Sequence, residues 1–183
     1  NTFRYKNFDL SVFINGSYGN KVYNYLSMKL THMNSPWTNQ LNAVNGRAQL
    51  VPINPNKVYE DGTMWYNDVS NVMVANPGAS IPRATINDPN DNDRISDRYI
   101  EDGSYIRLKN ISLGYTFPKK TIDKLGLSNL RIYANIQNLL TITGYDGYDP
   151  EIGASTSSVN VYGLDNGRYP SPTVYSFGLN VSF

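Results

Sequence analysis

The feature that most constrains the fold is a set of four stretches in which apolar and polar residues alternate with a period of two. They lie near residues 7–18, 104–117, 130–142 and 173–183. Because successive side chains of a β-strand point to opposite faces of a sheet, this period predicts four strands, each with one apolar face. The opposite faces hold small and amide side chains, and few of the lysines and glutamates that are typical of a sheet exposed to solvent. An all-β protein is therefore predicted.

Aromatic residues flank the aliphatic middle of these apolar faces. The last stretch, for example, has Tyr175 and Phe177 at one end and Phe183 at the other. Rings in these positions lie at headgroup depth in the strands of a membrane barrel. A strand of about 11 residues, at ~3.3 Å each and tilted by ~45°, rises ~25 Å, the height of an outer-membrane apolar band. The alternation alone is equally typical of a soluble β-sandwich.

The lengths of the three connections favour the barrel. Residues 19–103 and 144–171 form long connections, whereas residues 118–129 form a short one in which Gly126 ends a turn or two of helix. Long outer loops and short periplasmic turns are typical of outer-membrane barrels, and a sandwich of this size rarely contains a connection as long as the first. We therefore predict antiparallel strands joined by two extracellular loops and one periplasmic turn.

The first long connection has a helical pattern near its start. Val22, Leu26, Leu30 and Met33 recur at helical spacing, and Asn20 precedes them as a candidate N-cap. One short amphipathic helix is predicted in this loop.

The composition excludes several classes of function. The 183 residues contain no cysteine and one histidine, which excludes disulfides and thiolate metal sites. A net charge of +1 without a basic stretch argues against nucleic acid as a partner. No apolar run has the length of a membrane-spanning helix, and the first residues lack the pattern of a secretory signal.

Several motifs in order along the chain closely resemble the C-terminal region of SusC/RagA-family TonB-dependent outer-membrane transporters. They are Ile81-Pro82-Arg83-Ala84, the run at residues 96–115, Asn135-Ile136-Gln137-Asn138-Leu139-Leu140-Thr141, the run at residues 144–151, and the terminal Phe183. The opening residues 3–11 also resemble a barrel strand of such proteins. The combination of these motifs in this order is specific, although each motif alone is weak.

The resemblance implies a barrel of about 22 strands filled by an N-terminal plug. Residues 1–183 would be its last four strands with two outer loops, without the plug and the signal peptide. It further implies a Gram-negative outer-membrane importer of oligosaccharides or oligopeptides, with no enzymatic activity and no cofactor. Its partners would be the remaining barrel and plug, a SusD-like lipoprotein lid, outer-membrane lipid, and the TonB complex acting through the plug. The alternative is a soluble or surface-attached β-sandwich that binds glycans.

Aromatic residues in the predicted loops are candidate binding residues. Trp37, Trp65 and Tyr148 are assigned as possible contacts to ligand or lid, because their rings can stack on a sugar or hold a peptide. Alternatively, the tryptophans anchor the loop to the barrel wall or to a neighbouring protein. For Phe183, the resemblance implies a signal read by the barrel-insertion machinery, and interfacial anchoring is compatible with that role.

The remaining polar clusters are interpreted as structural. In the acid-rich stretch at residues 87–97, an EF-hand loop would need Gly and Glu where the sequence has Asp93 and Tyr99, so Asx turns explain it better. His32 has no second histidine near it in the sequence. A glycosidase needs a pair of carboxyl groups, which could in principle come from Asp146, Asp149 and Glu151. These residues, however, lie in a turn-rich run. No catalytic, cofactor-binding or metal-binding residue is assigned.

Overall fold

The computed structural model describes residues 1–88, 90–152, 154–155 and 158–183. These residues form two compact units. Unit 1 comprises Asn1–Tyr23 and Ile100–Phe183, and unit 2 comprises Asn24–Tyr99. None of the helices in the described part of the chain has the length and apolar character needed to cross a membrane.

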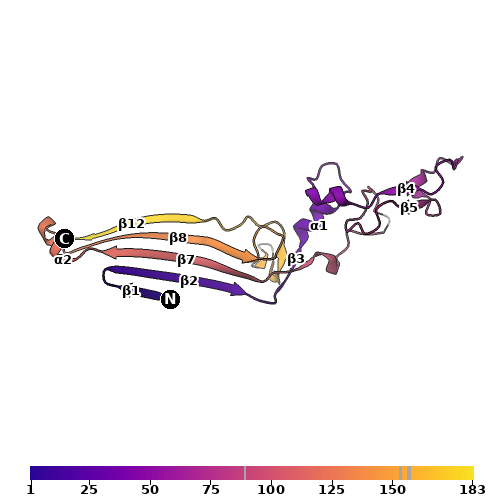
Figure 1. Ribbon diagram of the computed structural model, residues 1–183. Coiled ribbons are helices and arrows are strands. Elements are labelled where there is room, and N and C mark those ends of the chain that lie inside the picture. The colour runs from indigo at the N-terminus through magenta and orange to yellow at the C-terminus, as the bar shows by residue number, and fades with distance from the viewer. Residues whose placement is uncertain (89, 153, 156–157) are drawn as a thin grey trace. The chain divides into compact units, whose positions relative to one another are not determined.

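Unit 1 is built on an antiparallel sheet of five strands (Figure 1). Its order is β1-β2-β7-β8-β12. The strands are β1 (Thr2–Tyr5), β2 (Phe8–Ser17), β7 (Tyr105–Thr116), β8 (Asn129–Thr143) and β12 (Val174–Ser182). The protein is thus mostly β, as predicted, but β1 adds a fifth strand to the four expected. It is only four residues long and carries the same alternation, from Thr2 to Tyr5, that continues in β2.

The short connection between β7 and β8 contains two short helical turns. Helix α2 (Lys119–Ile122) leads into the 3₁₀ helix η4 (Asp123–Leu125). Gly126 then ends the turn in the left-handed conformation, with φ of 69°, which glycine adopts without steric cost. Ile122 is buried and fixes this turn at the end of the sheet.

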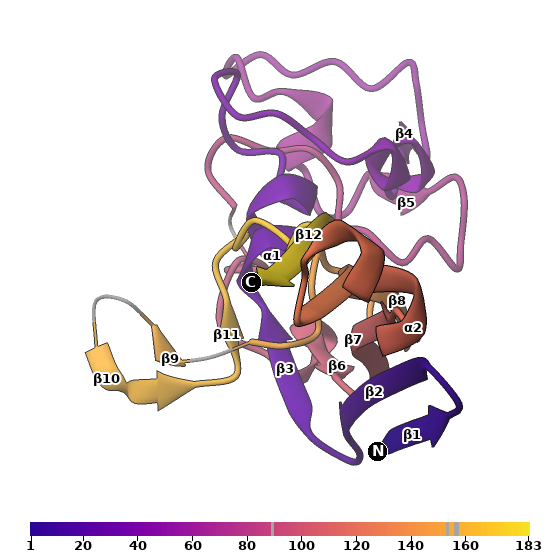
Figure 2. The same ribbon diagram turned by 90° about the vertical axis from the view of Figure 1, so that its left-hand side faces the viewer.

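Smaller sheets occupy the longer connections of unit 1. Strand β3 (Lys21–Asn24) lies between β11 (Leu164–Asp165) and β6 (Ile100–Asp102), as Figure 2 shows. Strands β9 (Ala154–Ser155) and β10 (Ser158–Tyr162) form a separate pair. The β3–β6 pair therefore joins the two ends of the first long connection. Lys21, near its start, lies opposite Asp102, near its end.

Unit 2 has little regular structure. It contains α1 (Tyr25–Thr31), the 3₁₀ helices η1 (Asn42–Gly46), η2 (Trp65–Asn67) and η3 (Asp97–Tyr99), and the pair of β4 (Leu50–Pro52) with β5 (Val72–Val74). Among the described residues of this unit, the buried apolar ones are Met28, Ile81 and Tyr99. The core is therefore small, and side-chain bonds to the backbone hold much of the chain in place.

The predicted helix begins later than its apolar spacing indicates. Pairing of β3 with β6 holds residues 21–23 in extended conformation, so Val22 packs in a sheet instead of a helix. The N-cap is Asn24, whose Oδ1 accepts a hydrogen bond of 2.8 Å from the Ser27 N–H, and not the predicted Asn20.

Candidate functional site

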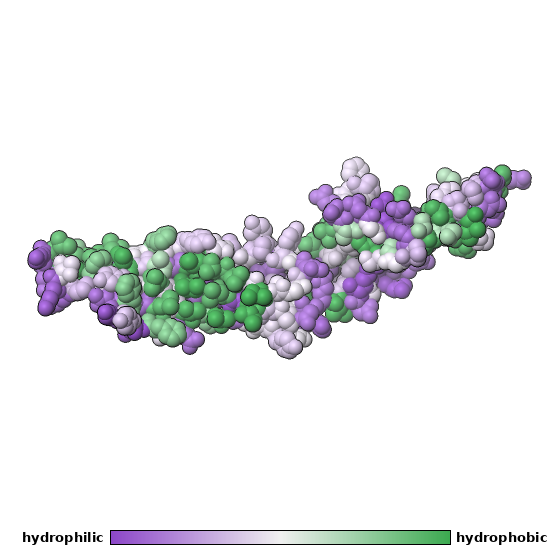
Figure 3. Space-filling model, in the orientation of Figure 1, coloured by the Kyte–Doolittle hydropathy of each residue, from purple (hydrophilic) through white to green (hydrophobic). Residues whose placement is uncertain are grey.

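The register of the large sheet sorts its side chains onto one apolar and one polar face. One row across four strands joins Val12, Ile111, Ile136 and Tyr175. The adjacent row, on the opposite face, joins the polar residues at 11, 112, 135 and 176. Because the alternation is in phase across the strands, the apolar face is continuous, and Figure 3 shows hydrophobic side chains gathered over this sheet.

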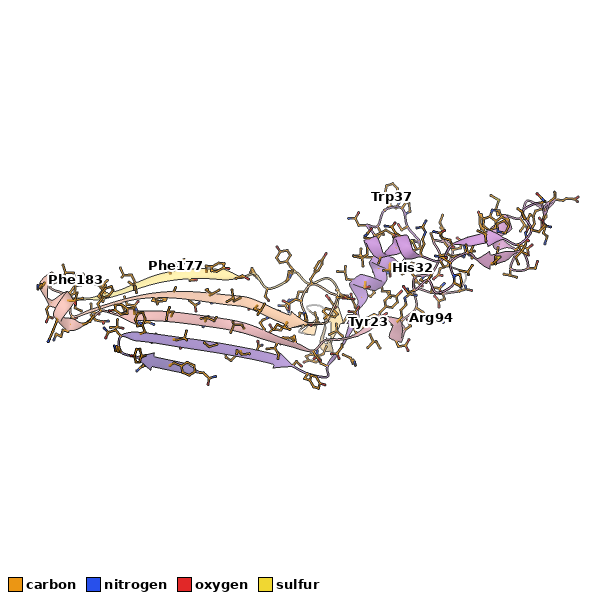
Figure 4. The ribbon with its side chains drawn as sticks, in the orientation of Figure 1. Tyr23, His32, Trp37, Arg94, Phe177 and Phe183 are labelled. Atoms are coloured by element: carbon orange, nitrogen blue, oxygen red, sulfur yellow. The ribbon has the colours of Figure 1, made fainter. Side chains whose placement is uncertain are left out.

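Other described residues leave this apolar face largely uncovered. Phe177, near the middle of the last strand, is 83% exposed, and Leu113 and Ile132 are about half exposed. Figure 4 shows Phe177 projecting from β12. An apolar surface spanning a whole sheet exceeds what a monomer in water normally exposes, so it indicates contact with lipid or protein.

Aromatic rings close the apolar face at the end that carries α2. The rings of Phe8 and Tyr115 are 4.7 Å apart, and those of Tyr115 and Phe117 are 5.0 Å apart in an edge-to-face arrangement. Phe183 lies at the same end of the sheet, where the Ser128 hydroxyl donates to its carbonyl oxygen at 3.2 Å while its ring remains 93% exposed. The backbone of the terminal residue is thus held and its ring is free for an outside contact.

The polar face carries an ion pair that crosses three strands. The Arg131 guanidinium on β8 reaches Asp9 on β2, with Nη2–Oδ2 of 2.6 Å and Nε–Oδ1 of 3.1 Å. It passes over Gly114 on the intervening strand, where any Cβ would collide with the guanidinium. This glycine therefore permits a two-point bond between strands that are not neighbours.

A buried charge cluster ties the second long connection to the sheet. Arg107 on β7 donates to Asp149 at 2.5 Å and to Glu151 at 2.7 Å, and its Nε donates to the Thr141 hydroxyl at 2.9 Å. The side chains of Arg107 and Asp149 are each only 4% exposed. Lys109 adds bonds of 2.6 and 2.8 Å to both oxygens of Glu151. Two cations from one strand thus neutralise two carboxylates from the loop.

Asp149 stays ionised in this environment. Burial alone raises the pKa of its carboxyl, but the Ser171 N–H, the Arg107 guanidinium and the Glu151 N–H together outweigh burial and lower the pKa below its usual value. The Ser171 N–H bond, at 3.0 Å, also connects the two ends of the loop. A general acid for glycoside hydrolysis needs a raised pKa, so this carboxyl serves as a structural anchor.

A second buried contact organises the same connection. The Tyr145 hydroxyl donates to Asp165 at 2.6 Å, and the Asp165 side chain accepts the N–H of Gly167 at 2.8 Å. Burial and the Asp165 carboxylate raise the pKa of Tyr145, so the phenol remains a donor. The Tyr145 ring lies against Gly147, where a Cβ would meet the ring. Residues 144–151, which are rich in Gly, Tyr and Asp, therefore form a packed loop.

The predicted binding aromatics lie in separate parts of the chain. Trp37 in unit 2 is 92% exposed, and Figure 4 shows it at the tip of a loop. Trp65, also in unit 2, is half-buried with its ring 5.7 Å from that of Tyr66. Tyr148 in unit 1 is exposed beside the Asp149 anchor. Their role as contacts to ligand or lid stays a prediction.

The charge cluster was missed because its residues are far apart in the sequence. Counting by twos from Ile111 places Arg107 and Lys109 on the apolar face predicted for their strand, and these two basic exceptions were the available signal. A register shift between Leu108 and Asn110 interrupts the alternation at this point in the structure. The structure also brings His32 close to two carboxylates of the acid-rich stretch, Asp88 and Asp93, which sequence reasoning treated separately.

No family model matches the sequence. Relatives are nevertheless clear: the chain is 35% identical to TonB-dependent receptor P3 of Formosa agariphila over 188 aligned residues, which cover all of this chain and 16% of that protein. TonB-dependent receptor P39 of the same organism is 31% identical, again over the whole chain. Half of the chain is 36% identical to TonB-dependent receptor SusC of Bacteroides thetaiotaomicron. The chain belongs to the TonB-dependent receptor family.

Solved structures agree on the fold. The RagAB peptide importer in its closed-closed state matches 98% of this chain with a TM-score of 0.64 and 19% identity. The open-open state of RagAB gives a TM-score of 0.60 over 97% of the chain. In each case the chain covers 16% of the matched protein. The fold of this chain therefore matches that of a segment of the RagAB structures.

The family assignment confirms three predictions made from the sequence. It confirms the resemblance to SusC/RagA-type receptors, it places the chain in the Gram-negative outer membrane, and the matched proteins are receptors and importers and not enzymes. The chain spans 16% of the length of the first Formosa relative. What the whole protein imports, and with which partners, is therefore a matter of proposal.

Proposed function

We propose that this chain forms part of the wall and outer loops of an outer-membrane active importer for oligosaccharides or oligopeptides. The observation that carries the proposal is the large sheet whose apolar face is continuous and uncovered and whose other face is polar. This arrangement fits lipid on one side and a filled lumen on the other. The kinship with TonB-dependent receptors supports the same reading.

The dimensions of the sheet fit a membrane barrel. Strand β2 has 10 residues and β7 has 12. Ten residues at ~3.3 Å each, tilted by ~45°, rise ~23 Å, close to the apolar band of ~25 Å. The rings of Phe8, Tyr115 and Phe117 would then lie in the lower aromatic girdle, with α2 at the periplasmic turn and residues 19–103 and 144–171 outside.

The polar face would line the barrel lumen. The side-chain oxygens of Asn15 and Asn110 are buried but have no hydrogen-bond partner among the described residues. Buried amide oxygens are normally satisfied, and a plug segment or lumen water over this face would satisfy them. We propose that the chain supplies the last strands of a barrel of about 22 strands closed around such a plug.

The complete transporter would work with partners outside this chain. A SusD-like surface lipoprotein would close over the outer loops as a lid, and the TonB complex would pull on the plug to release the substrate. RagAB is described as a peptide importer, which supports peptides as one substrate class for this importer. Trp37, Trp65 and Tyr148 would contribute contacts to the ligand or the lid.

Uptake by cells that depend on the natural protein containing this chain tests the proposal. Deleting its gene should abolish uptake of either labelled oligopeptides or labelled oligosaccharides, and restoring it in a strain without TonB should not rescue uptake. The purified protein should require detergent and show a heat-dependent gel mobility. Solubility without detergent, together with glycan binding, would support the β-sandwich module instead.

Phe183 is proposed to act as a barrel-assembly signal because its ring is free at the sheet end while its backbone is held. Deleting Phe183 should lower the amount of folded protein in the outer membrane more than it lowers uptake per inserted molecule. Phe183→Tyr, which keeps a terminal aromatic ring, serves as the control. Unchanged insertion after the deletion would contradict the role.

A further inference from the structure

The three side chains brought together in unit 2 include the one histidine of the sequence. The Nε2 atom of His32 lies 3.9 Å from Asp88 Oδ2 and 3.9 Å from Asp93 Oδ2. One ligand atom from each of the three residues lies within 4.8 Å of the others. Figure 4 shows His32 on the chain that follows α1. The cluster thus joins the end of the helix to the acid-rich stretch.

The histidine nitrogen that faces this cluster is unpaired among the residues that the structure describes. The imidazole is nine-tenths buried, and its Nε2 makes no hydrogen bond to any described residue. A separation of 3.9 Å is too long for a hydrogen bond to either carboxylate. Because a buried polar atom without a partner is destabilising, this nitrogen indicates a missing ligand between it and the two carboxylates.

The acid-rich stretch holds Asp88 in place for this contact. Its Oδ1 accepts a hydrogen bond of 2.9 Å from the Asn92 amide, and its Oδ2 accepts the Asp93 N–H at 3.1 Å. The Thr85 N–H donates to the Met33 carbonyl at 3.2 Å, which ties the stretch to the residue after His32. Asp88 is 11% exposed and Asp93 is 39% exposed, so the cluster is supported from within and open to solvent on one side.

We propose that His32, Asp88 and Asp93 bind one divalent transition-metal ion of the zinc class, with water as a further ligand. An imidazole nitrogen with two carboxylate oxygens suits Zn²⁺ and its neighbours, whereas Ca²⁺ and Mg²⁺ favour sites made of oxygen ligands. Bonds of ~2.0–2.2 Å in a tetrahedral site put ligand atoms ~3.4 Å apart. The distance from His32 Nε2 to each carboxylate oxygen, now 3.9 Å, would therefore shorten by about half an ångström around the ion. The proposal departs from the prediction of no metal site.

This ion would give unit 2 a crosslink that its small apolar core lacks. It would connect the residue that follows α1 with the stretch around residues 88–93, and the more exposed Asp93 would face the side from which the ion enters. The inference concerns residues of unit 2 alone and is independent of the transport proposal.

Metal titration of the full natural protein in detergent tests the site. After chelator treatment, calorimetric titration with ZnCl₂ should show one ion per chain. His32→Ala, Asp88→Asn and Asp93→Asn should each weaken Zn²⁺ binding by more than about tenfold, the lower end of the loss seen on removing an outer-shell partner. Asp91→Asn is the matched control, because it removes a charge from the same stretch outside the cluster, and its affinity should be unchanged.

Co²⁺ gives a second measurement that does not depend on the variants. Binding in place of Zn²⁺ should produce the visible absorption of a low-coordinate cobalt site, and added Zn²⁺ should remove that absorption. A heat-dependent gel shift of each variant checks that the barrel has folded. Absence of Zn²⁺ binding, equal binding by His32→Ala and Asp91→Asn, or tight binding of Ca²⁺ that Zn²⁺ does not displace would each overturn the proposal.

Discussion

The large sheet of unit 1 and the irregular unit 2 satisfy the hydrogen-bonding groups of their backbones in different ways. In the sheet, strands of up to 15 residues pair with one another along their length. In unit 2 the paired strands have three residues each, and side chains such as Asn71 and Asp68 bond the backbone instead. This difference shows that a regular period in the sequence indicates backbone-to-backbone hydrogen bonds between strands. A high content of Asn and Asp indicates that side chains hydrogen-bond to the backbone instead.

The largest expected effect comes from breaking the charge cluster that joins the sheet to its second loop. Asp149→Ala leaves Arg107 buried without one of its partners, which should destabilise the anchored loop by about 3–5 kcal/mol. Hydrogen exchange in peptides around residues 144–152 and 163–171 measures this loss. Asp146→Ala is the control, because that exposed neighbour lies outside the cluster. Equal exchange in both variants would show that the cluster does not hold the loop.

The two faces of the sheet should differ in their tolerance of charge. Val12→Arg places a cation on the apolar face and should destabilise the inserted barrel by about 2–4 kcal/mol if the position lies at the bilayer midplane. Ser11→Arg puts the same group on the polar face of the same strand and should be tolerated much better. Urea unfolding from detergent or lipid bilayers compares the two. A larger loss for Ser11→Arg would reverse the assignment of the faces.

Close packing between strands gives a smaller effect. The Tyr133 ring lies across its cross-strand neighbour Gly178, so the Cβ of Gly178→Ala would collide with the ring. Overpacking of this kind should cost about 1–3 kcal/mol. Combining the change with Tyr133→Ala removes the collision, and Gly178→Ala should then cost little. The same loss in both backgrounds, measured by chemical unfolding, would exclude the ring as the cause.

Cap removal in unit 2 should have a modest effect on α1. Asn24→Ala removes the side-chain acceptor of the Ser27 N–H and should destabilise the helix by about 1 kcal/mol. Asn20→Ala, at the cap position that the sequence predicted, should leave the helix unaffected. Faster hydrogen exchange at residues 25–31 in the first variant only is the expected result. Faster exchange in Asn20→Ala only would instead support Asn20 as the N-cap.

Acidification should loosen the second loop of unit 1, because it protonates Asp149. The effect should be negligible near neutral pH and should grow as the pH falls. The pKa of this carboxyl is lower in the folded chain than in the unfolded chain, so its contribution to stability is complete above the ordinary carboxyl pKa. That contribution is lost as the pH falls through the folded-state pKa. Proteolysis with an acid-active protease between pH 5 and pH 2 should show earlier cleavage near residues 145–152 at low pH. Asp149→Asn should remove most of this dependence.

Much of the sheet could be predicted because its strands are long and regular. The alternation around Val12 and Ile111 gave both the face and the strand, and Gly126 marked the end of the short turn. In the first long connection, the apolar spacing from Val22 to Met33 predicted a helix that begins too early. The start of that segment forms a strand instead, because it pairs with β6, which lies about 80 residues away in the sequence.

The sequence by itself determined which side chains share a face of the sheet, because that depends only on the period of a strand. It also determined the family, through motifs that follow one another in a fixed order. Only the tertiary structure decided which distant charges meet, as when Arg107 reaches Asp149 and when His32 faces Asp88 and Asp93. The physical reason is that cross-strand register and loop closure set these contacts, and neither is encoded in the residues next to the groups that they join.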